Sequence, residues 1–217
     1  MDFLLSTAYL PNIEYFGVIK AANHVWIENH ETYARQTYRN RCYIAGPNGR
    51  QMLIIPVVRP NGNHTSINEI LIDNKQAWQK IHWRSIETAY NRSAFFQYYK
   101  DEFETLFTEP YYKLIDFNQK ALWKLLKILH IDKNILLTEK YTAEWPEEII
   151  DLRNEIVPNR KGILSNVYFE SYFQPFSPKY GFLPNLSVID LLFNQGPYSG
   201  EYIHAIAQHI EEIIVNR

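Results

Sequence analysis

Short apolar runs separated by turn-forming residues open the chain. Residues 3–10 form an apolar run of strand length, Pro11 and Asn12 interrupt it, and residues 13–22 repeat apolar side chains at helical spacing. Residues 24–28, His-Val-Trp-Ile-Glu, have the composition of a second strand. A strand, a helix and a strand in this order predict a β-α-β unit, whose two strands are parallel and joined by a right-handed crossover.

The next apolar segments predict an antiparallel hairpin. Residues 38–45 and 51–58 are strand-like and flank a Gly-Pro-Asn-Gly turn at residues 46–49. Residues 67–72 are a further short strand candidate. Together with the parallel opening unit, the hairpin predicts a mixed sheet.

Helical spacing dominates from residue 74 to residue 130. Apolar positions predict helices at about residues 78–90, 95–107 and 114–129, and the third has a wide apolar stripe suited to packing on a sheet. We therefore expect these helices to cover a sheet face.

The last third of the chain has a more varied pattern. It predicts a strand at 135–138, a helix at 145–157 with an acidic first turn, a strand at 167–173, a structured loop at 176–185 and closing helices at 187–193 and 198–215. The whole pattern predicts one α/β domain over residues 1–217. Its sheet would be mixed and mainly parallel, with a β-hairpin insertion and several covering helices.

Composition narrows the class of protein. Hydrophobic residues make up 46% and charged residues 21% of the 217 residues, which is an ordinary globular balance. The net charge of −2 supplies no positive field for nucleic acid or an anionic membrane, and no apolar stretch approaches the roughly 18 residues of a membrane helix. Cys42 is the only cysteine, so no intrachain disulfide and no Cys-based zinc site can form. We expect a cytoplasmic protein without a nucleic-acid partner, a membrane partner or a bound metal.

Familiar catalytic signatures are absent: the chain has no Walker A loop, G-x-G-x-x-G, H-E-x-x-H or G-x-S-x-G. A first group of candidates is Glu28, His30 and Glu31, directly after the second predicted strand. Ligands of open α/β sheets bind at the carboxyl ends of strands, so these residues are candidates for acid-base catalysis. The alternative is a solvated polar loop.

A second group lies in Tyr38-Arg39-Asn40-Arg41. On a strand, Arg39 and Arg41 would share a face, where two guanidinium groups could clamp the phosphates of a nucleotide sugar. Asn40 lies between them as a further substrate-binding candidate. The alternative is an exposed sheet face with weak cross-strand ion pairs.

Further candidates are scattered through the chain. Asp190 follows Ser187 by three residues, a variant of the capping box, yet it lies in a strongly apolar helix where a polar group needs a partner or a site. Asn185 belongs to the turn before that helix. His82, four residues after Trp78, is either a general base in a cleft or a hydrogen-bonded histidine on a helix face.

Several of these segments together resemble the WbqC-like family in order and spacing. The match covers nearly the whole chain and rests on four stretches: Tyr9-Leu10-Pro11 leading to Tyr15-Phe16-Gly17; Tyr38 to Arg41; Trp83 with Thr88-Ala89-Tyr90; and G-F-L-P-N-L-S-V-I-D-L-L-F-N-Q-G-P from Gly181. The resemblance implies modification of O-antigen-type sugars in bacterial surface-polysaccharide biosynthesis, by attachment of an acyl or aminoacyl group. It also adds Tyr9 and Tyr15 to the substrate-binding candidates. The chain departs from the family pattern by lacking the Gln before the aromatic-rich turn, which leaves its substrate open.

Two hypotheses follow. The first is a transferase or ATP-dependent amide-forming enzyme that acts on a small molecule, a sugar or sugar nucleotide, with ATP or a nucleotide sugar as the candidate cofactor. The second is a non-catalytic binding or assembly protein, homo-oligomers included, because 16 Tyr, 12 Phe and 5 Trp suit an interface as well as a core or a sugar site.

Overall fold

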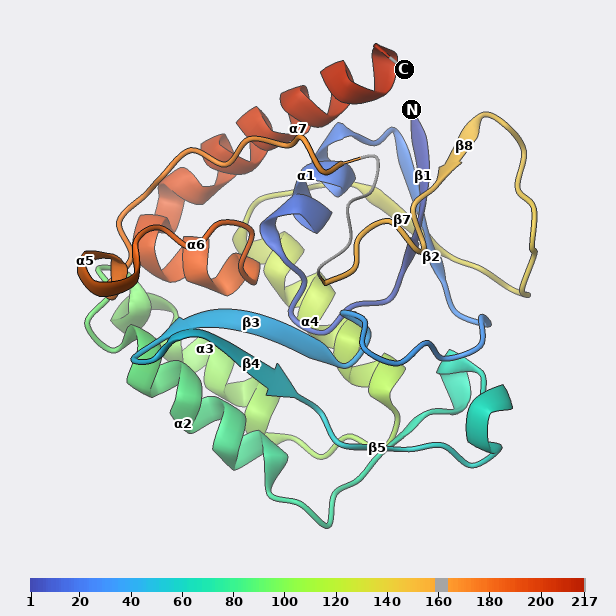
Figure 1. Cartoon of the computed structure of the whole chain (residues 1–217). Coiled ribbons are helices and arrows are strands. Elements are labelled where there is room, and N and C mark those ends of the chain that lie inside the picture. Colours follow the sequence, from blue (N-terminus) through green and yellow to red (C-terminus); the bar gives the residue numbers. More distant parts are fainter. Residues whose placement is uncertain (159–163, 217) are drawn as a thin grey trace.

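A four-stranded parallel sheet forms the centre of the computed structural model, which describes residues 1–158 and 164–216 (Figure 1). The strand order is β7-β2-β1-β8. The four strands are β1 (Asp2–Ser6), β2 (His24–Glu28), β7 (Asn134–Leu137) and β8 (Ile149–Asp151). All three neighbouring pairs are parallel.

The opening β-α-β unit is confirmed. Helix α1 (Ile13–Ala21) joins β1 to β2, and the Asn12 side chain caps it by accepting a hydrogen bond from the Tyr15 backbone N–H. The first strand is shorter than predicted and ends at Ser6. Residues 7–12 instead form the turn that leads into α1, and Asn12, the last of them, caps the helix.

Two antiparallel pairs lie outside the parallel sheet. The predicted hairpin consists of β3 (Arg41–Gly46) and β4 (Gly49–Ile54). The second pair consists of β5 (Val57–Val58) and β6 (Leu71–Ile72). Between them lie the 3-10 turns η1 (Gly62–His64) and η2 (Ile67–Glu69), so only the end of the strand predicted at 67–72 is extended. The mixed, mainly parallel α/β class with a hairpin and several helices is confirmed.

Three helices follow the hairpin, close to the predicted bounds. They are α2 (Trp78–Tyr90), α3 (Phe96–Thr108) and α4 (Leu114–Ile128). Helix α2 packs on β3, and α2 and α3 both contact α6 (Val188–Gln195). An aromatic core forms where they meet: the Phe193 ring of α6 lies 5.2 Å from that of Tyr90 and 5.1 Å from that of Phe96.

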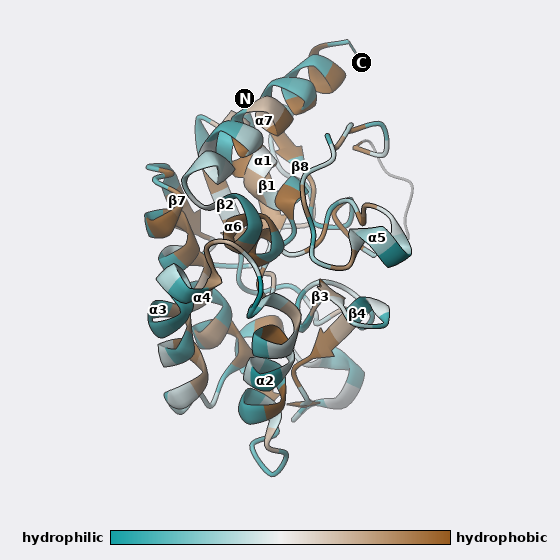
Figure 2. Cartoon of the chain, turned by 90° about the vertical axis from the view of Figure 1, so that its left-hand side faces the viewer, coloured by the Kyte–Doolittle hydropathy of each residue, from teal (hydrophilic) through white to brown (hydrophobic). Residues whose placement is uncertain are grey.

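The last helix, α7 (Ser199–Val215), lies against α1 (Figure 1). Gly17 permits the contact, because a Cβ at this position would collide with Ile206 and lie 2.9 Å from Cδ1 of Ile210. The single-turn helix α5 (Ser177–Tyr180) and the 3-10 turn η3 (Gly196–Tyr198) precede α6 and α7 respectively. In Figure 2, the apolar residues concentrate in the strands and on one side of the helices.

Two predictions for the last third were wrong. Residues 145–157 contain strand β8 rather than a helix, because Ile149 and Ile150 pair with Asp2 and Phe3 of β1. Residues 167–173 run without strand pairing, and Tyr168 and Phe173 are largely exposed. Within the described ranges, no helix has both the length and the apolar character needed to cross a bilayer.

Candidate functional site

A row of four polar side chains crosses the carboxyl edge of the parallel sheet. Ser6 pairs with Glu28 in the register of β1 and β2, and Thr138 continues β7 beside Glu28. Arg153 follows Asp151, the register partner of Leu4, by two positions and is therefore level with Ser6. Because side chains alternate between faces along a strand, the four lie on one face in strand order: Thr138, Glu28, Ser6, Arg153.

Glu28 is the hub of this row and is fully buried. Its Oε1 accepts hydrogen bonds from the Thr138 hydroxyl at 2.8 Å and the His30 backbone N–H at 2.8 Å. Its Oε2 lies 3.2 Å from Nη1 of Arg153. The same guanidinium contacts the Asp151 carboxylate, with 2.6 Å between Nη2 and Oδ2. Both oxygens of Glu28 are therefore engaged, and the residue positions Arg153.

A second buried ion pair adjoins the first. Arg39 and Glu31 form a two-pronged pair, with Nε–Oε1 at 2.8 Å and Nη2–Oε2 at 2.6 Å. Nη2 of Arg39 also donates to Oγ of Ser6 at 2.6 Å, and that hydroxyl donates to the Arg153 carbonyl at 2.9 Å. Ser6 thus joins the two ion pairs into one charged network.

Tyr15 extends the network from α1. Its hydroxyl donates to the Ser6 carbonyl at 2.9 Å. Burial raises the pKa of Tyr15, an effect that the positive charge of Arg39 opposes. The phenol therefore stays protonated and fixes the end of β1.

Two carboxylates and two guanidiniums removed from water carry a large desolvation cost, which apolar residues would avoid. The network also lies where open α/β sheets bind ligands. Buried charged groups with a high desolvation cost at the carboxyl edge of a sheet are typical of a functional site. This sheet-edge cluster is the candidate site.

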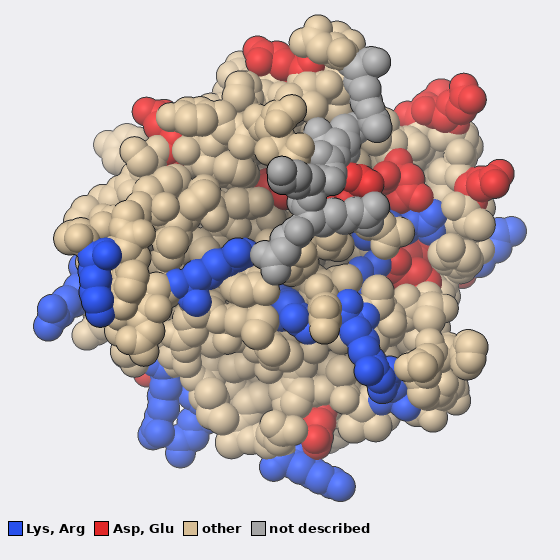
Figure 3. Space-filling model, viewed as in Figure 1, with Lys and Arg blue, Asp and Glu red and all other residues tan. Residues whose placement is uncertain are grey.

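The rim of the sheet-edge cluster reaches solvent. The Asp151 side chain is 39% exposed, and the half-buried His30 ring has its Nδ1 3.1 Å from Nδ2 of Asn68. Tyr141, which is 54% exposed, lies with its ring centre 5.3 Å from the Arg153 guanidinium. Figure 3 shows acidic and basic side chains interspersed on the side of the molecule where β2 and β8 end. The rim thus presents to solvent the His30 ring and the Asp151 carboxylate, which Arg153 holds in place.

Of the residues proposed from sequence, Glu28, Glu31, Arg39 and Tyr15 come together in this cluster, and His30 lies at its rim. The predicted Arg39–Arg41 clamp is not formed. Strand β3 begins at Arg41, so Arg39 precedes it and turns inward to Glu31, while Arg41 is half-buried beside Met52. Asn40 donates to the Ile55 carbonyl and holds the hairpin instead.

Tyr9 and His82 form a separate pair in the aromatic core. The Tyr9 hydroxyl lies 2.8 Å from Nδ1 of His82, and Trp78 and Phe117 surround them. Burial lowers the pKa of His82 to about 4 and raises that of Tyr9. Both are neutral near pH 7 and hydrogen-bonded to each other.

Asn185 lies at the start of α1 rather than at the sheet edge. Its Oδ1 accepts from the Glu14 backbone N–H at 3.0 Å, and its Nδ2 donates to the Glu14 carboxyl at 3.2 Å. Burial raises the pKa of Glu14 to about 7, which hydrogen bonds from Asn185 and Asn12 partly offset. Glu14 is therefore a carboxyl group that can change its charge near neutral pH.

Asp190 is fully buried and has three side-chain donors. Its carboxyl accepts from Tyr90 and Tyr172 at 2.7 Å each and from Gln174 at 2.8 Å. Burial raises its pKa, and the three hydrogen bonds oppose the shift. The capping box predicted with Ser187 is not formed, because the Asp190 carboxyl turns to these donors. Asp190 connects α2, α6 and the segment before α5.

Sequence reasoning missed Ser6, Thr138, Asp151 and Arg153. Thr138 is the last residue of the strand predicted at 135–138, so its position at a strand end was a usable signal. Ser6 lies inside the strand predicted at 3–10, which is longer than the observed one, so its position at a strand end was not recognisable. Arg153 fell in a segment read as helical, so its place after a strand could not be recognised. The described residues hold no group of three or more His, Cys, Asp or Glu side chains suited to a metal ion.

The fold and the sheet-edge cluster define an α/β protein with a buried charged network at the carboxyl end of its parallel sheet. A model of the WbqC-like protein family matches residues 7–202, so the chain belongs to this family. It is also similar to the uncharacterized protein Rv1507c of Mycobacterium tuberculosis (strain ATCC 25618 / H37Rv), with 25% identity over 233 residues that cover 94% of this chain and 98% of the relative. No solved structure gives a significant match.

Proposed function

We propose that the chain is a transferase or ATP-dependent amide-forming enzyme that acts on a sugar or sugar nucleotide in bacterial surface-polysaccharide biosynthesis. The observation that carries the proposal is the sheet-edge cluster, two buried ion pairs joined through Ser6 at the ends of four parallel strands. Family membership agrees with it, because the resemblance implies attachment of an acyl or aminoacyl group to an amino sugar.

Each charged residue has a role in this proposal. Glu31 and Glu28 are positioning residues that hold Arg39 and Arg153. The two guanidiniums in turn fix Ser6 and Asp151 at the edge where the acyl donor would lie. Asp151 or His30, at the rim, takes the proton that the attacking amine loses as its nitrogen bonds to the acyl carbon. The leaving group departs from that carbon with the bonding electron pair.

The test uses rim variants, because substitutions of the buried residues threaten the fold. Purified protein is incubated with ATP, acyl or aminoacyl donors and amino-sugar nucleotides, and amide products are detected by mass spectrometry. We expect Asp151→Asn or His30→Gln to lower the turnover about 100-fold or more, in the range of general acid-base contributions. Asp132→Asn, an exposed carboxylate outside the cluster, is the matched control and should keep full activity.

The rival hypothesis is a non-catalytic assembly protein, which the exposed Tyr98, Trp123 and Tyr198 favour. Light scattering measures the oligomeric state of the same preparations. A stable oligomer that forms no product and shows no thermal shift with any sugar nucleotide would support the rival and overturn the proposed function.

A further inference from the structure

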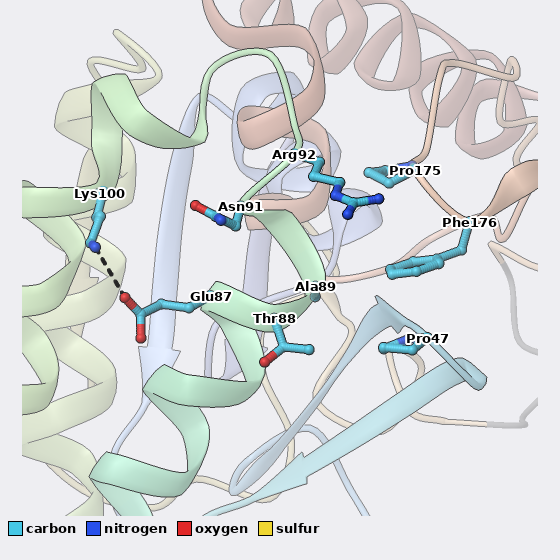
Figure 4. Close-up of a pocket in the computed structure, with 9 residues that line it drawn as sticks. All are labelled: Pro47, Glu87, Thr88, Ala89, Asn91, Arg92, Lys100, Pro175 and Phe176. Atoms are coloured by element: carbon cyan, nitrogen blue, oxygen red, sulfur yellow. Dashed lines mark ion pairs between the residues drawn. The ribbon is translucent and has the colours of Figure 1, made fainter.

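A cavity of about 650 Å³ lies between the end of α2, the start of α3, the hairpin turn and the segment before α5 (Figure 4). The Arg92 guanidinium points toward Pro175 and Phe176, and Pro47 lies on the opposite wall. Lys100 enters from α3, with its Nζ 3.1 Å from the Glu87 carboxylate. The cavity thus combines an aromatic ring with basic side chains.

A second cavity of about 660 Å³ adjoins the first along α2. Pro47 and Thr88 line both, so the two cavities are neighbours along α2 and the hairpin, and we refer to them together as the groove. Arg84 lines this second part, as does Arg50, whose guanidinium is stacked on the Tyr43 ring at 3.8 Å from its centre. Each part has the size of a small-molecule site.

The groove is positively charged in a chain whose net charge is −2. Apart from the stacked Arg50, three cations, Arg84, Arg92 and Lys100, line it against one anion, Glu87, which gives a formal charge of +2. Glu87 is already paired with Lys100, and within the described residues Arg84 and Arg92 make no ion pair. Arginines without a carboxylate in a groove attract anions, and a cleft concentrates their field.

The two ends of the groove differ in character. At the α5 end, the Phe176 ring, the Arg92 guanidinium and two prolines offer flat surfaces of the kind on which nucleobases stack. At the other end, Arg84 offers a guanidinium, a group that binds phosphate oxygens in pairs. We propose that the groove binds a nucleoside polyphosphate, with its base against Phe176 and Arg92 and its phosphates toward Arg84. The site is distinct from the sheet-edge cluster, and binding there does not depend on the proposed reaction.

Isothermal titration calorimetry without any acceptor substrate tests the proposal. The probes are ADP, UDP, adenosine and inorganic pyrophosphate. The wild type should bind both nucleotides. Arg84→Ala should weaken binding of the nucleotides and of pyrophosphate tenfold or more, whereas Phe176→Ala should weaken nucleotide binding and leave pyrophosphate binding unchanged. Lys127→Ala, an exposed cation on α4, is the charge-matched control and should bind like the wild type.

Two results would overturn the proposal: no heat of binding with millimolar nucleotide, or equal losses in Lys127→Ala and Arg84→Ala. Because Asp151 lies outside the groove, Asp151→Asn should retain full nucleotide binding. Nucleotide binding without turnover would therefore refute the proposed reaction and leave the groove assignment standing.

Discussion

Glu14 couples the folding free energy to pH through a single carboxyl group. Its pKa rises from 4.5 to about 7, mainly because burial disfavours the charged form. The folded state therefore binds this proton more tightly than the unfolded state does. The resulting stabilisation is complete below about pH 4.5 and is lost as the pH rises through 7.

Glu14→Gln removes this titration and keeps a polar side chain of similar shape. We expect the wild type to lose up to about 3 kcal/mol of unfolding free energy between pH 5 and pH 8 relative to this variant. Urea denaturation at several pH values measures the difference. Parallel stability profiles for the two proteins would contradict the pKa assignment.

About half of the residues of the sheet-edge cluster could be predicted from residue type and position in the sequence. Glu28 and Glu31 were recognised because they follow a strand whose pattern was clear. Arg153 was not, because it lies 125 positions from Glu28 and reaches it only when β8 pairs with β1. The sequence also did not predict that Arg39 pairs with Glu31 and forms no clamp with Arg41, since this depends on where β3 begins.

At the level of elements, helices with strong periodicity were predicted within a few residues. Strand β8 was missed because its three residues carry no pattern of their own, and only the edge of β1 makes them a strand. The preceding Glu147 and Glu148 resemble the acidic first turn of a helix and so favoured the wrong prediction. Local signals therefore sufficed for α1 to α4, α6 and α7, while the edge strand required tertiary information.

The contact between α1 and α7 depends on the missing side chain of Gly17. We expect Gly17→Ala to destabilise the protein by about 1–3 kcal/mol, because its methyl group would force Ile206 and Ile210 aside. Gly200→Ala is the matched control within α7. The nearest atom to its Cβ would be the Leu129 carbonyl oxygen at 3.8 Å, so this change should be neutral or slightly stabilising.

Thermal unfolding of the two glycine variants measures this difference. Combining Gly17→Ala with Ile206→Ala should cost less than the sum of the single changes, since the smaller side chain makes room for the methyl group. Strict additivity would show that the two residues are not in contact.

For the whole molecule, the core extends from Phe3 in β1 to Ile210 in α7 without a break. β1 lies between β2 and β8, and α7 covers α1. We expect a single cooperative unfolding transition, as for one domain, with calorimetric and van't Hoff enthalpies in agreement. Differential scanning calorimetry with intrinsic fluorescence as a second probe checks this, and two resolved transitions would argue for two folding units.

The packing of α1 against α7 also bears on how the protein is made. Ribosomes add about 5–20 residues per second, so α1 emerges tens of seconds before the helix that covers it. During that interval the apolar surface of α1 is exposed to other nascent chains. Contacts between segments so distant in sequence also form slowly. The helix that covers α1 is thus translated long after α1 itself, and chaperone protection of the nascent chain would matter most before it arrives.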